Sequence, residues 1–325
     1  MLDLAEQHEA RERLRYQQQS LPNGLHDENI HHDDTRVRFR FQRRLGRGSF
    51  GDVSEVQELS TGAVYARKLI HFDEESTRAT IEKDVRNEVT IMQKLRHQHI
   101  ASVLLFVKEP DAYSILMLPV ADSDLLMYLE RCVSKKYPMS LLKRLYPWFG
   151  CLLDALAYAH KLNINHRDIK PSNVLIKDGQ LFLADFGVAK DFTKQAMSAT
   201  DDYFVKGTPV YRAPETCPDN PRGPPADIFA LGCVFSEMLT VRKGRSLEDF
   251  RQWRRAPDHE NGLFAFRASL PKVKEWITQL EQDALSELVV DQISAMLQED
   301  PDDRPTAQES VNFLRTERAL FCANH

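Results

Sequence analysis

The chain has 325 residues, of which 42% are hydrophobic and 28% charged, with 13 Gly, 16 Pro and five cysteines. This composition excludes collagen-like, low-complexity and fully disordered proteins, and no run approaches the roughly 18 apolar residues of a membrane-spanning helix. The first residues lack the basic flank and apolar run of a signal peptide, and the cysteines show no Cys-x-x-Cys spacing. We therefore expect reduced thiols, no zinc site and a cytoplasmic or nuclear location.

The net charge of −5 lies mostly in residues 1–36, which hold eight acidic residues and four arginines. The remaining body is nearly neutral, which argues against wholesale attraction to nucleic acid or to a membrane surface. Residues 1–36 are rich in helix formers but have no continuous apolar stripe, and residues 21–24 end any helix. We interpret this segment as a flexible or helical N-terminal arm, with a docking or autoinhibitory segment as the alternative.

The body begins with a β-rich pattern. Residues 37–41 alternate apolar and polar side chains, as in a half-buried strand that includes Phe39 and Phe41. Further strand patterns occupy residues 53–57, 63–66, 100–107 and 113–118, with a turn at 60–62. Residues 76–96 have apolar positions at a helical period. From residue 123 onward the long patterns are helical except around residues 164–190, so a small β-rich part precedes a larger helical one.

Three glycines, Gly46, Gly48 and Gly51, lie between two strand patterns. A dinucleotide-binding turn needs a helix after it, so these glycines fit a hairpin flap whose N–H groups approach phosphates, with a plain hairpin turn as the alternative. Lys68 lies inside the apolar run of the next strand and needs a partner or a ligand. Glu88 on the predicted helix is a candidate ion-pair partner, and two ordinary surface charges are the alternative.

The motif His-Arg-Asp-Ile-Lys-Pro-Ser-Asn is the most specific in the chain. In it, Asp168 can accept a hydroxyl proton, Lys170 can neutralise a transferring phosphoryl group, and Asn173 can ligate a metal. Residues 185–187, Asp-Phe-Gly, supply a second metal carboxylate beside a glycine. Residues 213–215, Ala-Pro-Glu, end the segment that begins at Asp185.

The order and spacing of these motifs resemble those of eukaryotic-type protein kinases over residues 37–318. The resemblance implies an α+β, two-lobed fold with a small β-rich N-lobe at 37–117, a hinge at 118–121 and a larger helical C-lobe at 122–318, followed by a tail at 319–325. It also implies phosphorylation of Ser/Thr hydroxyls of protein substrates by ATP with Mg²⁺, or Mn²⁺ in its place. An inactive or catalytically weak pseudokinase that serves as a binding scaffold is the alternative.

The resemblance also assigns roles to single residues. It implies that Lys68, held by Glu88, contacts the α- and β-phosphates and that Asp168 deprotonates the substrate hydroxyl. The catalytic residues would be Asp168, Lys170, Lys68 and Glu88, and the metal ligands Asn173 and Asp185. The ATP-binding residues would be Leu45, Gly46, Gly48, Gly51, Val53, Ala66, Lys68, Met117, Leu118, Val120, Asp124 and Leu175. Among these, Met117 would be the gatekeeper and Asp124 a ribose contact.

The Ser/Thr branch of the family is indicated by two positions. Lys170 follows Asp168 by two residues, whereas tyrosine kinases usually carry Arg and Ala in this loop. Thr208 stands where that branch has a threonine bonded to the catalytic loop. Phe204 falls where many relatives carry an activating phosphothreonine opposite the loop arginine, here Arg167, so control by a phosphate at that place is not expected.

Several structural expectations complete the sequence interpretation. Asp227 resembles the helix aspartate that fixes the backbone of the His-Arg-Asp loop, and Arg304 the buried partner of Glu215. Pro147 either lies early in a helix or kinks it. Residues 242–255 are locally basic and are interpreted as a solvated helix face, with docking of acidic substrates as the alternative. The cysteines expected to be buried thiols are Cys132, Cys151 and Cys233.

Overall fold

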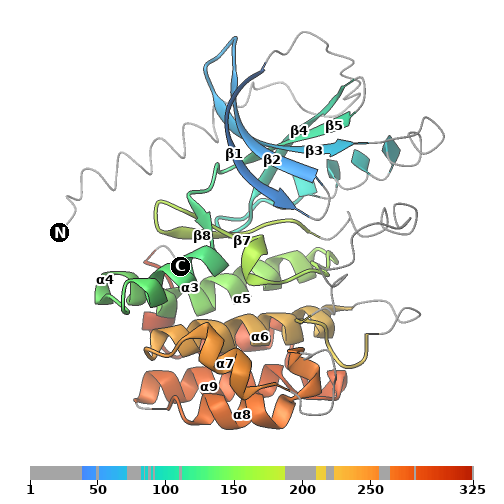
Figure 1. Cartoon of the computed structure of the whole chain (residues 1–325). Coiled ribbons are helices and arrows are strands. Elements are labelled where there is room, and N and C mark those ends of the chain that lie inside the picture. The colour runs from blue at the N-terminus through green and yellow to red at the C-terminus, as the bar shows by residue number, and fades with distance from the viewer. Residues whose placement is uncertain are drawn as a thin grey trace. The chain divides into compact units, whose positions relative to one another are not determined.

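The computed structural model describes residues 39–48, 51–71, 82–109, 112–186, 210–216, 223–255 and 264–323, apart from positions 84, 87, 88, 91 and 282. The chain divides into two units, residues 1–34 and 35–325, and every described residue belongs to the second. The second unit has a β-sheet in its N-terminal part and a helical C-terminal part (Figure 1), which confirms the predicted α+β, two-lobed fold.

The N-terminal part is a five-stranded antiparallel sheet with the strand order β1-β2-β3-β5-β4. Its strands are β1 (Phe39–Gly48), β2 (Gly51–Glu58), β3 (Val64–His71), β4 (Ser102–Lys108) and β5 (Ala112–Leu118). The predicted turn between β2 and β3 is present, with Gly62 at a positive φ of 75° that glycine adopts without strain. Between β3 and β4, the described residues from 82 to 93 are helical, as their apolar spacing predicted.

Strand β1 departs from the predicted half-buried alternation. Phe41 is 60% exposed, and residues 40–44 all lie on the surface. The register of β1 against β2 shifts between Phe41 and Arg43 and again between Arg44 and Gly46. Each such irregularity breaks the two-residue period of the side chains, so the sequence alternation does not persist as one buried face.

A small three-stranded sheet, β6 (Ser123–Asp124), β7 (Val174–Lys177) and β8 (Gln180–Leu183), lies at the start of the helical part. A parallel bridge between Ile100 and Leu183 joins β8 to the segment before β4, so the two parts are directly hydrogen-bonded there. The helices are α3 (Leu125–Ser134), α4 (Met139–Leu142), α5 (Leu145–Lys161), α6 (Pro224–Arg242), α7 (Leu247–Trp253), α8 (Leu270–Thr278), α9 (Ala284–Met296) and α10 (Ala307–Leu314).

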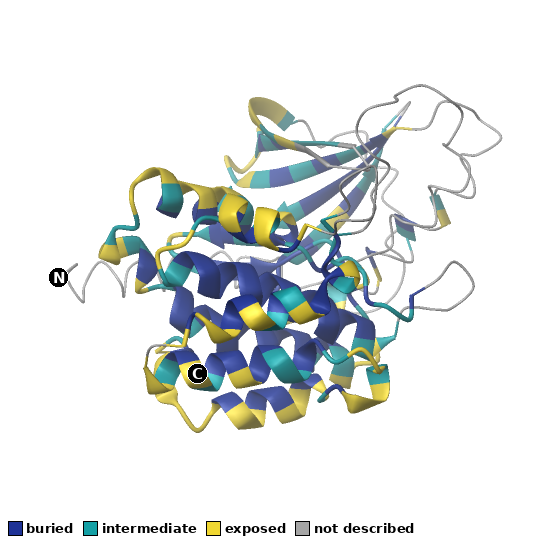
Figure 2. Ribbon diagram, turned by 60° about the horizontal axis from the view of Figure 1, so that its bottom comes forward, coloured by how far each residue is buried: buried dark blue, intermediate teal, exposed yellow. Residues whose placement is uncertain are grey.

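Helices α5 and α6 form the centre of the helical part, which Figure 2 shows as dark-blue buried residues beneath exposed outer faces. Among the described residues, α6 is the one helix long and apolar enough to cross a membrane, but 89% of its apolar window is buried inside the fold. Pro147 is the third residue of α5, where the N–H has no intrahelical partner, so the earlier of its two predicted placements is correct. The three cysteines expected to be buried are buried.

The chain's last described segment packs onto α5. Leu320 and Phe321 are buried, and they lie over Gly150 of α5. A Cβ at Gly150 would stand 2.5 Å from the Leu320 carbonyl oxygen and from the Phe321 ring. Glycine at this position therefore permits a close approach that any other residue would block.

Two basic residues of the stretch 242–255, Lys243 and Arg254, are used inside the fold, so the interpretation as a solvated face is wrong for them, whereas Arg245 and Arg255 are exposed. Arg254 is 2% exposed, lies 3.7 Å from the centre of the Phe266 ring and faces Glu237 at 3.5 Å. The Lys243 ammonium pairs with Asp283 at 2.8 Å. Carboxylates of the helical part therefore balance both charges, and an aromatic ring packs against the Arg254 guanidinium.

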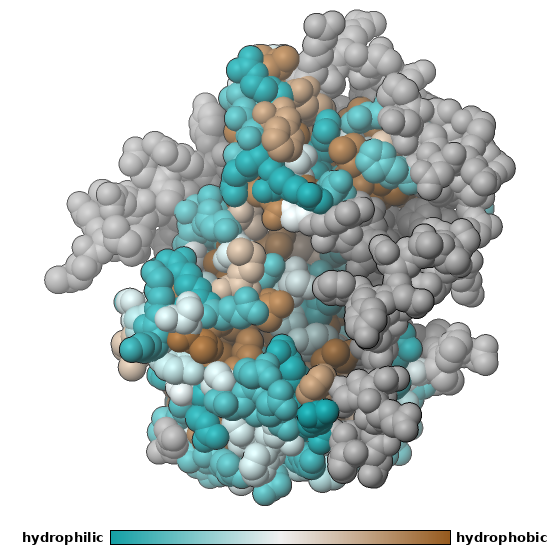
Figure 3. Space-filling view, in the orientation of Figure 1, coloured by the Kyte–Doolittle hydropathy of each residue, from teal (hydrophilic) through white to brown (hydrophobic). Residues whose placement is uncertain are grey.

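On the face shown in Figure 3, hydrophilic residues dominate the lower helices, and hydrophobic residues gather where the sheet meets them.

Candidate active site

The loop that holds the His-Arg-Asp motif is fixed by a buried carboxylate. Asp227, on α6, is 2% exposed and accepts the backbone N–H groups of His166 and Arg167, both at 2.7 Å. It also accepts the Nε2–H of His160 at 3.0 Å. The first two bonds are those predicted for Asp227, whereas the part played by His160 was missed. The signal in the sequence was the position of His160 in the last turn of the helix that precedes the loop.

His166 joins this loop to the end of β8. Its ring is fully buried, its Nε2 lies 2.9 Å from the Ala184 carbonyl oxygen, and its centroid lies 4.5 Å from that of Phe186. Burial lowers the pKa of His166, so the imidazole is neutral at pH 7. The neutral ring donates from Nε2 to Ala184 and accepts the Asp168 N–H at Nδ1, 3.3 Å away. The His-Arg-Asp loop and the segment that leads into Asp185 are thereby held in a fixed relation.

Three of the predicted site residues meet around one carboxylate. The Lys170 ammonium lies 2.9 Å from Oδ2 of Asp168, and the Asn173 amide nitrogen lies 3.2 Å from the same oxygen. The Asn173 amide also donates to the Asp168 carbonyl at 2.8 Å. A short 3-10 turn over Pro171–Asn173 brings the asparagine back toward the aspartate. The carboxylate is therefore held in one orientation with a cation beside it.

Lys68 carries the ammonium of the sheet. It is 5% exposed and shares the buried face of β3 with Ala66 and Ile70. Its Nζ lies 2.7 Å from Oδ1 of Asp185, so a residue of the sheet and a residue after β8 converge on one point. Glu88, the predicted partner, lies outside the described residues.

Asn173 and Asp185 are the residues that could hold a metal ion. The Asn173 amide nitrogen is directed at Asp168, which makes its carbonyl oxygen the ligand atom. The backbone N–H of Ala184 donates to the backbone carbonyl of Asn173 at 2.9 Å, so the residue next to Asp185 contacts Asn173. An amide oxygen and a carboxylate form the hard oxygen donor set that Mg²⁺ prefers, so these residues fit that ion.

The predicted ATP-binding residues of the sheet lie in two neighbouring rows of cross-strand pairs. In one row, Gly46 of β1 is opposite Val53 of β2, and Val53 is opposite Lys68 of β3. In the other, Ala66, two residues before Lys68 on the same buried face of β3, is opposite Met117 of β5. The two rows together carry residues predicted to contact the nucleotide from β1 to β5.

The glycine motif forms a hairpin. Gly48, at the end of β1, pairs directly with Gly51, at the start of β2. Because a strand and not a helix follows, the dinucleotide-binding alternative is excluded. Beyond β5, residues 118–120 lead to β6, and the Leu118–Pro119 peptide bond is cis. Val120 follows and is half-buried.

In the small sheet, Asp124 of β6 pairs with Leu175 of β7, so the predicted ribose contact and another predicted ATP-binding residue are neighbours. The Asp124 carboxylate also caps α3, accepting the Met127 N–H at 2.8 Å. Burial raises the pKa of Asp124. This residue thus fixes the start of α3 beside the site.

Of the segment between Asp185 and Glu215, the structure describes residues 185–186 and 210–215. Thr208 lies outside the described residues, and Arg167 is described with a φ of 66°, a left-handed conformation that is unusual for arginine. Glu215 forms the predicted pair with Arg304, through two contacts of 2.8 and 2.9 Å. Arg304 further donates to the carbonyls of Gln298, Pro225 and Glu299, so the end of the segment is bound firmly to the helical part.

Comparison with known proteins agrees with this geometry. The family described as "Protein kinase domain" matches residues 39–313. The chain is 30% identical over 284 residues to "Probable serine/threonine-protein kinase fhkD" of Dictyostelium discoideum, an alignment that covers 79% of this chain and 35% of the relative. It is 29% identical over 299 residues to "Serine/threonine-protein kinase dst1" of the same organism, covering 89% and 36%. The chain therefore spans about a third of the length of these curated relatives.

Proposed function

This chain belongs to the protein kinase family, and from that premise we propose that it is an active kinase that uses ATP and Mg²⁺ to phosphorylate Ser/Thr hydroxyls of protein substrates. One observation carries the proposal. Lys170 and Asn173 both lie within hydrogen-bond distance of the Asp168 carboxylate, on a loop whose backbone is bound to the buried Asp227. Such an orientation, fixed before substrate binds, is what phosphoryl transfer requires of the protein.

In the proposed reaction the substrate hydroxyl oxygen attacks the γ-phosphorus of ATP, ADP leaves, and the hydroxyl proton passes to the Asp168 carboxylate. The Lys170 ammonium, 2.9 Å from Asp168, lies where it can also neutralise charge on the transferring group. The two hydrogen bonds from Asn173 keep the Asp168 carboxylate and carbonyl from rotating away.

The nucleotide would be held from both parts of the molecule. Lys68 supplies an ammonium for the α- and β-phosphates, and Asn173 and Asp185 would hold Mg²⁺, which supplies charge neutralisation at the phosphates. The Lys68 Nζ lies 2.7 Å from Oδ1 of Asp185, so the cation proposed to bind phosphate and the carboxylate proposed to bind metal are in direct contact.

Preference for serine and threonine rests on Lys170, two residues after Asp168, and on Thr208. Both curated relatives carry serine/threonine kinase names. Serine and threonine carry their hydroxyl on a short side chain, so the substrate backbone must come close to the Asp168 carboxylate. Tyrosine would place its hydroxyl further from the peptide backbone.

The test is transfer of labelled γ-phosphate from ATP to a library of peptides that contain serine, threonine or tyrosine. We expect serine and threonine peptides to be labelled. Asp168→Asn should lower the rate by at least about 10³-fold, or about 4 kcal/mol in activation free energy. Asp178→Asn, the same change on the exposed turn after β7, is the matched control and should keep full activity.

Two outcomes would contradict the proposal. Labelling that survives Asp168→Asn would mean that this carboxylate is not the catalytic group. ATP binding by the native chain without any transfer, to peptides or to itself, would indicate a binding scaffold instead of a kinase.

A further inference from the structure

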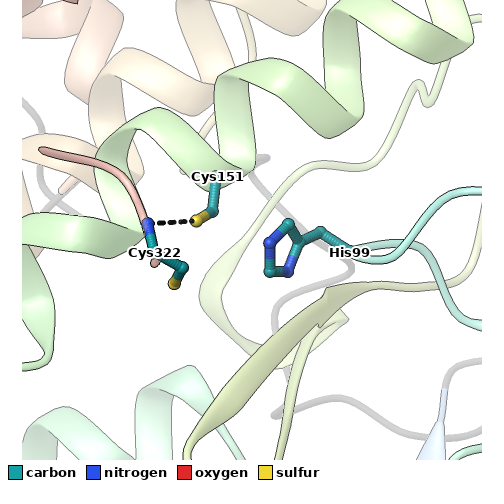
Figure 4. A group of neighbouring side chains, drawn as sticks. All are labelled: His99, Cys151 and Cys322. Atoms are coloured by element: carbon teal, nitrogen blue, oxygen red, sulfur yellow. Dashed lines mark hydrogen bonds between the residues drawn. The ribbon is translucent and has the colours of Figure 1, made fainter. Parts of the chain in front are cut away.

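Three potential metal ligands that the proposed transfer reaction does not use converge in the fold (Figure 4). His99 precedes β4, Cys151 lies on α5, and Cys322 lies in the segment that packs onto α5. One ligand atom from each lies within 4.8 Å of the other two. We propose that His99, Cys151 and Cys322 bind one Zn²⁺ ion.

The histidine is oriented as a metal ligand is. Its Nδ1 lies 3.0 Å from the Leu181 carbonyl oxygen, and because a carbonyl only accepts, Nδ1 must carry the proton. The lone pair of the ring is therefore on Nε2. Metal-binding histidines are almost always held in this way, with the second ring nitrogen donating to a carbonyl or carboxylate. The ring is 4% exposed, so its orientation is fixed by packing.

The two cysteines already contact each other. The Cys322 backbone N–H donates to the Cys151 sulfur at 3.4 Å (Figure 4). Binding of the metal would displace the thiol protons of both residues, because the thiolate is the form of cysteine that binds zinc.

The donor set selects the metal. Two sulfurs and one imidazole suit Zn²⁺ and disfavour Mg²⁺ and Ca²⁺, which take oxygen ligands. Two thiolates and one Zn²⁺ sum to zero charge, which a largely buried position requires. With zinc–sulfur bonds of about 2.3 Å and a zinc–nitrogen bond of about 2.0 Å, the donors need to approach to within about 4 Å of one another. Cys322 is partly exposed, which leaves room for a water molecule as the fourth ligand.

The site also explains how three distant parts of the chain meet. The segment that carries Cys322 approaches α5 closely at Gly150. His99 is joined to β8 by a backbone hydrogen bond, since its carbonyl accepts the Leu183 N–H at 2.8 Å. Zinc would therefore tie the end of the chain to the strand that leads into Asp185. The cysteine spacing predicted no zinc site, because these three ligands share no short motif in the sequence.

Zinc binding is tested on the full-length, chelator-stripped and reduced protein by titration with Co²⁺, followed by Zn²⁺. We expect one equivalent of Co²⁺ to give thiolate-to-cobalt charge-transfer bands and tetrahedral d–d bands, and one equivalent of Zn²⁺ to abolish them. Zn²⁺ should also raise the melting temperature. Cys322→Ala and His99→Gln should each weaken binding at least about a hundredfold, beyond the loss expected for an outer-shell contact. Cys132→Ala, which removes a buried thiol of α3, is the matched control and should bind like the native chain.

Three results would overturn the proposal. The first is cobalt binding without thiolate bands, as the histidines at positions 26, 31 and 32 would give. The second is thiolate bands that survive Cys322→Ala. The third is a Cys151–Cys322 disulfide, found by peptide mass mapping of protein kept under reducing conditions until alkylation. Because these measurements involve no phosphoryl transfer, their outcome is independent of that of the proposed function.

Discussion

The sheet of residues 39–118 and the helical part of residues 122–323 hold their charged groups in different ways. In the helical part, Asp227 accepts three hydrogen bonds and Arg304 donates to one carboxylate and three carbonyls, all from within that part. In the sheet, Lys68 is the buried cation of the described strands, and its partner, Asp185, comes from the helical part. The helical part therefore orients Asp227 and Arg304 by itself, whereas Lys68 of the sheet is paired with a residue of the helical part.

This difference matches what each part is proposed to do. A catalytic carboxylate must keep one orientation, and a loop bound to a buried aspartate gives it that. A phosphate-binding ammonium must instead exchange partners when nucleotide arrives, and a pair whose carboxylate is one-third exposed can do so at a lower cost than a sealed one. We infer that the helical part supplies orientation and that the Lys68–Asp185 pair supplies adaptability.

Lys68→Met should produce the largest effect in the sheet. The change removes the ammonium for the phosphates, and we expect transfer to slow by several orders of magnitude, about 5 kcal/mol or more in activation free energy. The free energy of unfolding should change far less, because water can reach the remaining Asp185 carboxylate. Peptide phosphorylation and urea unfolding measure the two quantities. Lys177→Met, at an exposed pair with Asp122, is the control. If Lys68→Met retains a tenth of the rate, the sheet does not hold phosphate through this residue.

Asp227→Asn should affect both stability and rate. The amide keeps the shape but presents N–H groups to donors, so at least one of the three bonds to His160, His166 and Arg167 is lost. We expect the free energy of unfolding to fall by about 3 kcal/mol and kcat to fall with little change in the KM for ATP. Asp291→Asn, on the exposed face of α9, should alter neither quantity. A loss of ATP affinity with unchanged kcat would contradict the orienting role of Asp227.

Ion pairs of the two parts should also contribute different amounts to the free energy of unfolding. Glu215→Ala leaves the buried Arg304 guanidinium without its carboxylate but with three carbonyls, and we expect a loss of about 2 to 3 kcal/mol in unfolding free energy. Glu55→Ala removes the partner of Arg43, whose side chain is 56% exposed, and should cost at most about 1 kcal/mol. Urea unfolding of both variants checks this. Equal losses would mean that burial does not distinguish the two pairs.

The same contrast shows what the sequence could predict. The pairs made by Asp227 and by Arg304 were predictable because each residue stands in a motif whose partners have fixed positions along the chain. The strands of the sheet and the turn at Gly62 followed from local alternation and turn chemistry. These features depend on neighbours in sequence or on a spacing that the family repeats.

Features made by distant segments were not predictable. Arg254 is one of several basic residues in its stretch, and only the fold surrounds it with Phe250, Phe266 and Glu237. The exposure of Phe41 depends on where the register of β1 shifts against β2. The meeting of Cys151 and Cys322 depends on how the last described segment packs onto α5. In each case the deciding partner is far away along the chain, and no local period encodes it.

The smallest predicted effect concerns a carboxylate that supports the sheet from the helical segment before β4. Glu82 accepts from Arg86 at 2.8 and 3.0 Å and from the Tyr113 hydroxyl at 2.9 Å, and it lies 3.3 Å from the Lys108 ammonium. These contacts, with Arg86 contributing most, lower the pKa of Glu82 from 4.5 to about 2. A carboxyl whose pKa is depressed on folding stabilises the fold at pH values above its pKa in the unfolded chain. That contribution disappears as the pH falls through its pKa in the folded chain.

The difference in unfolding free energy between the native chain and Glu82→Gln should therefore be full above pH 4.5 and should shrink as the pH approaches about 2. Urea unfolding at a series of pH values measures it, with Tyr113→Phe reducing the pH-dependent part because one donor is gone. A difference that stays constant across this range would mean that Glu82 acts through its shape and not through its charge.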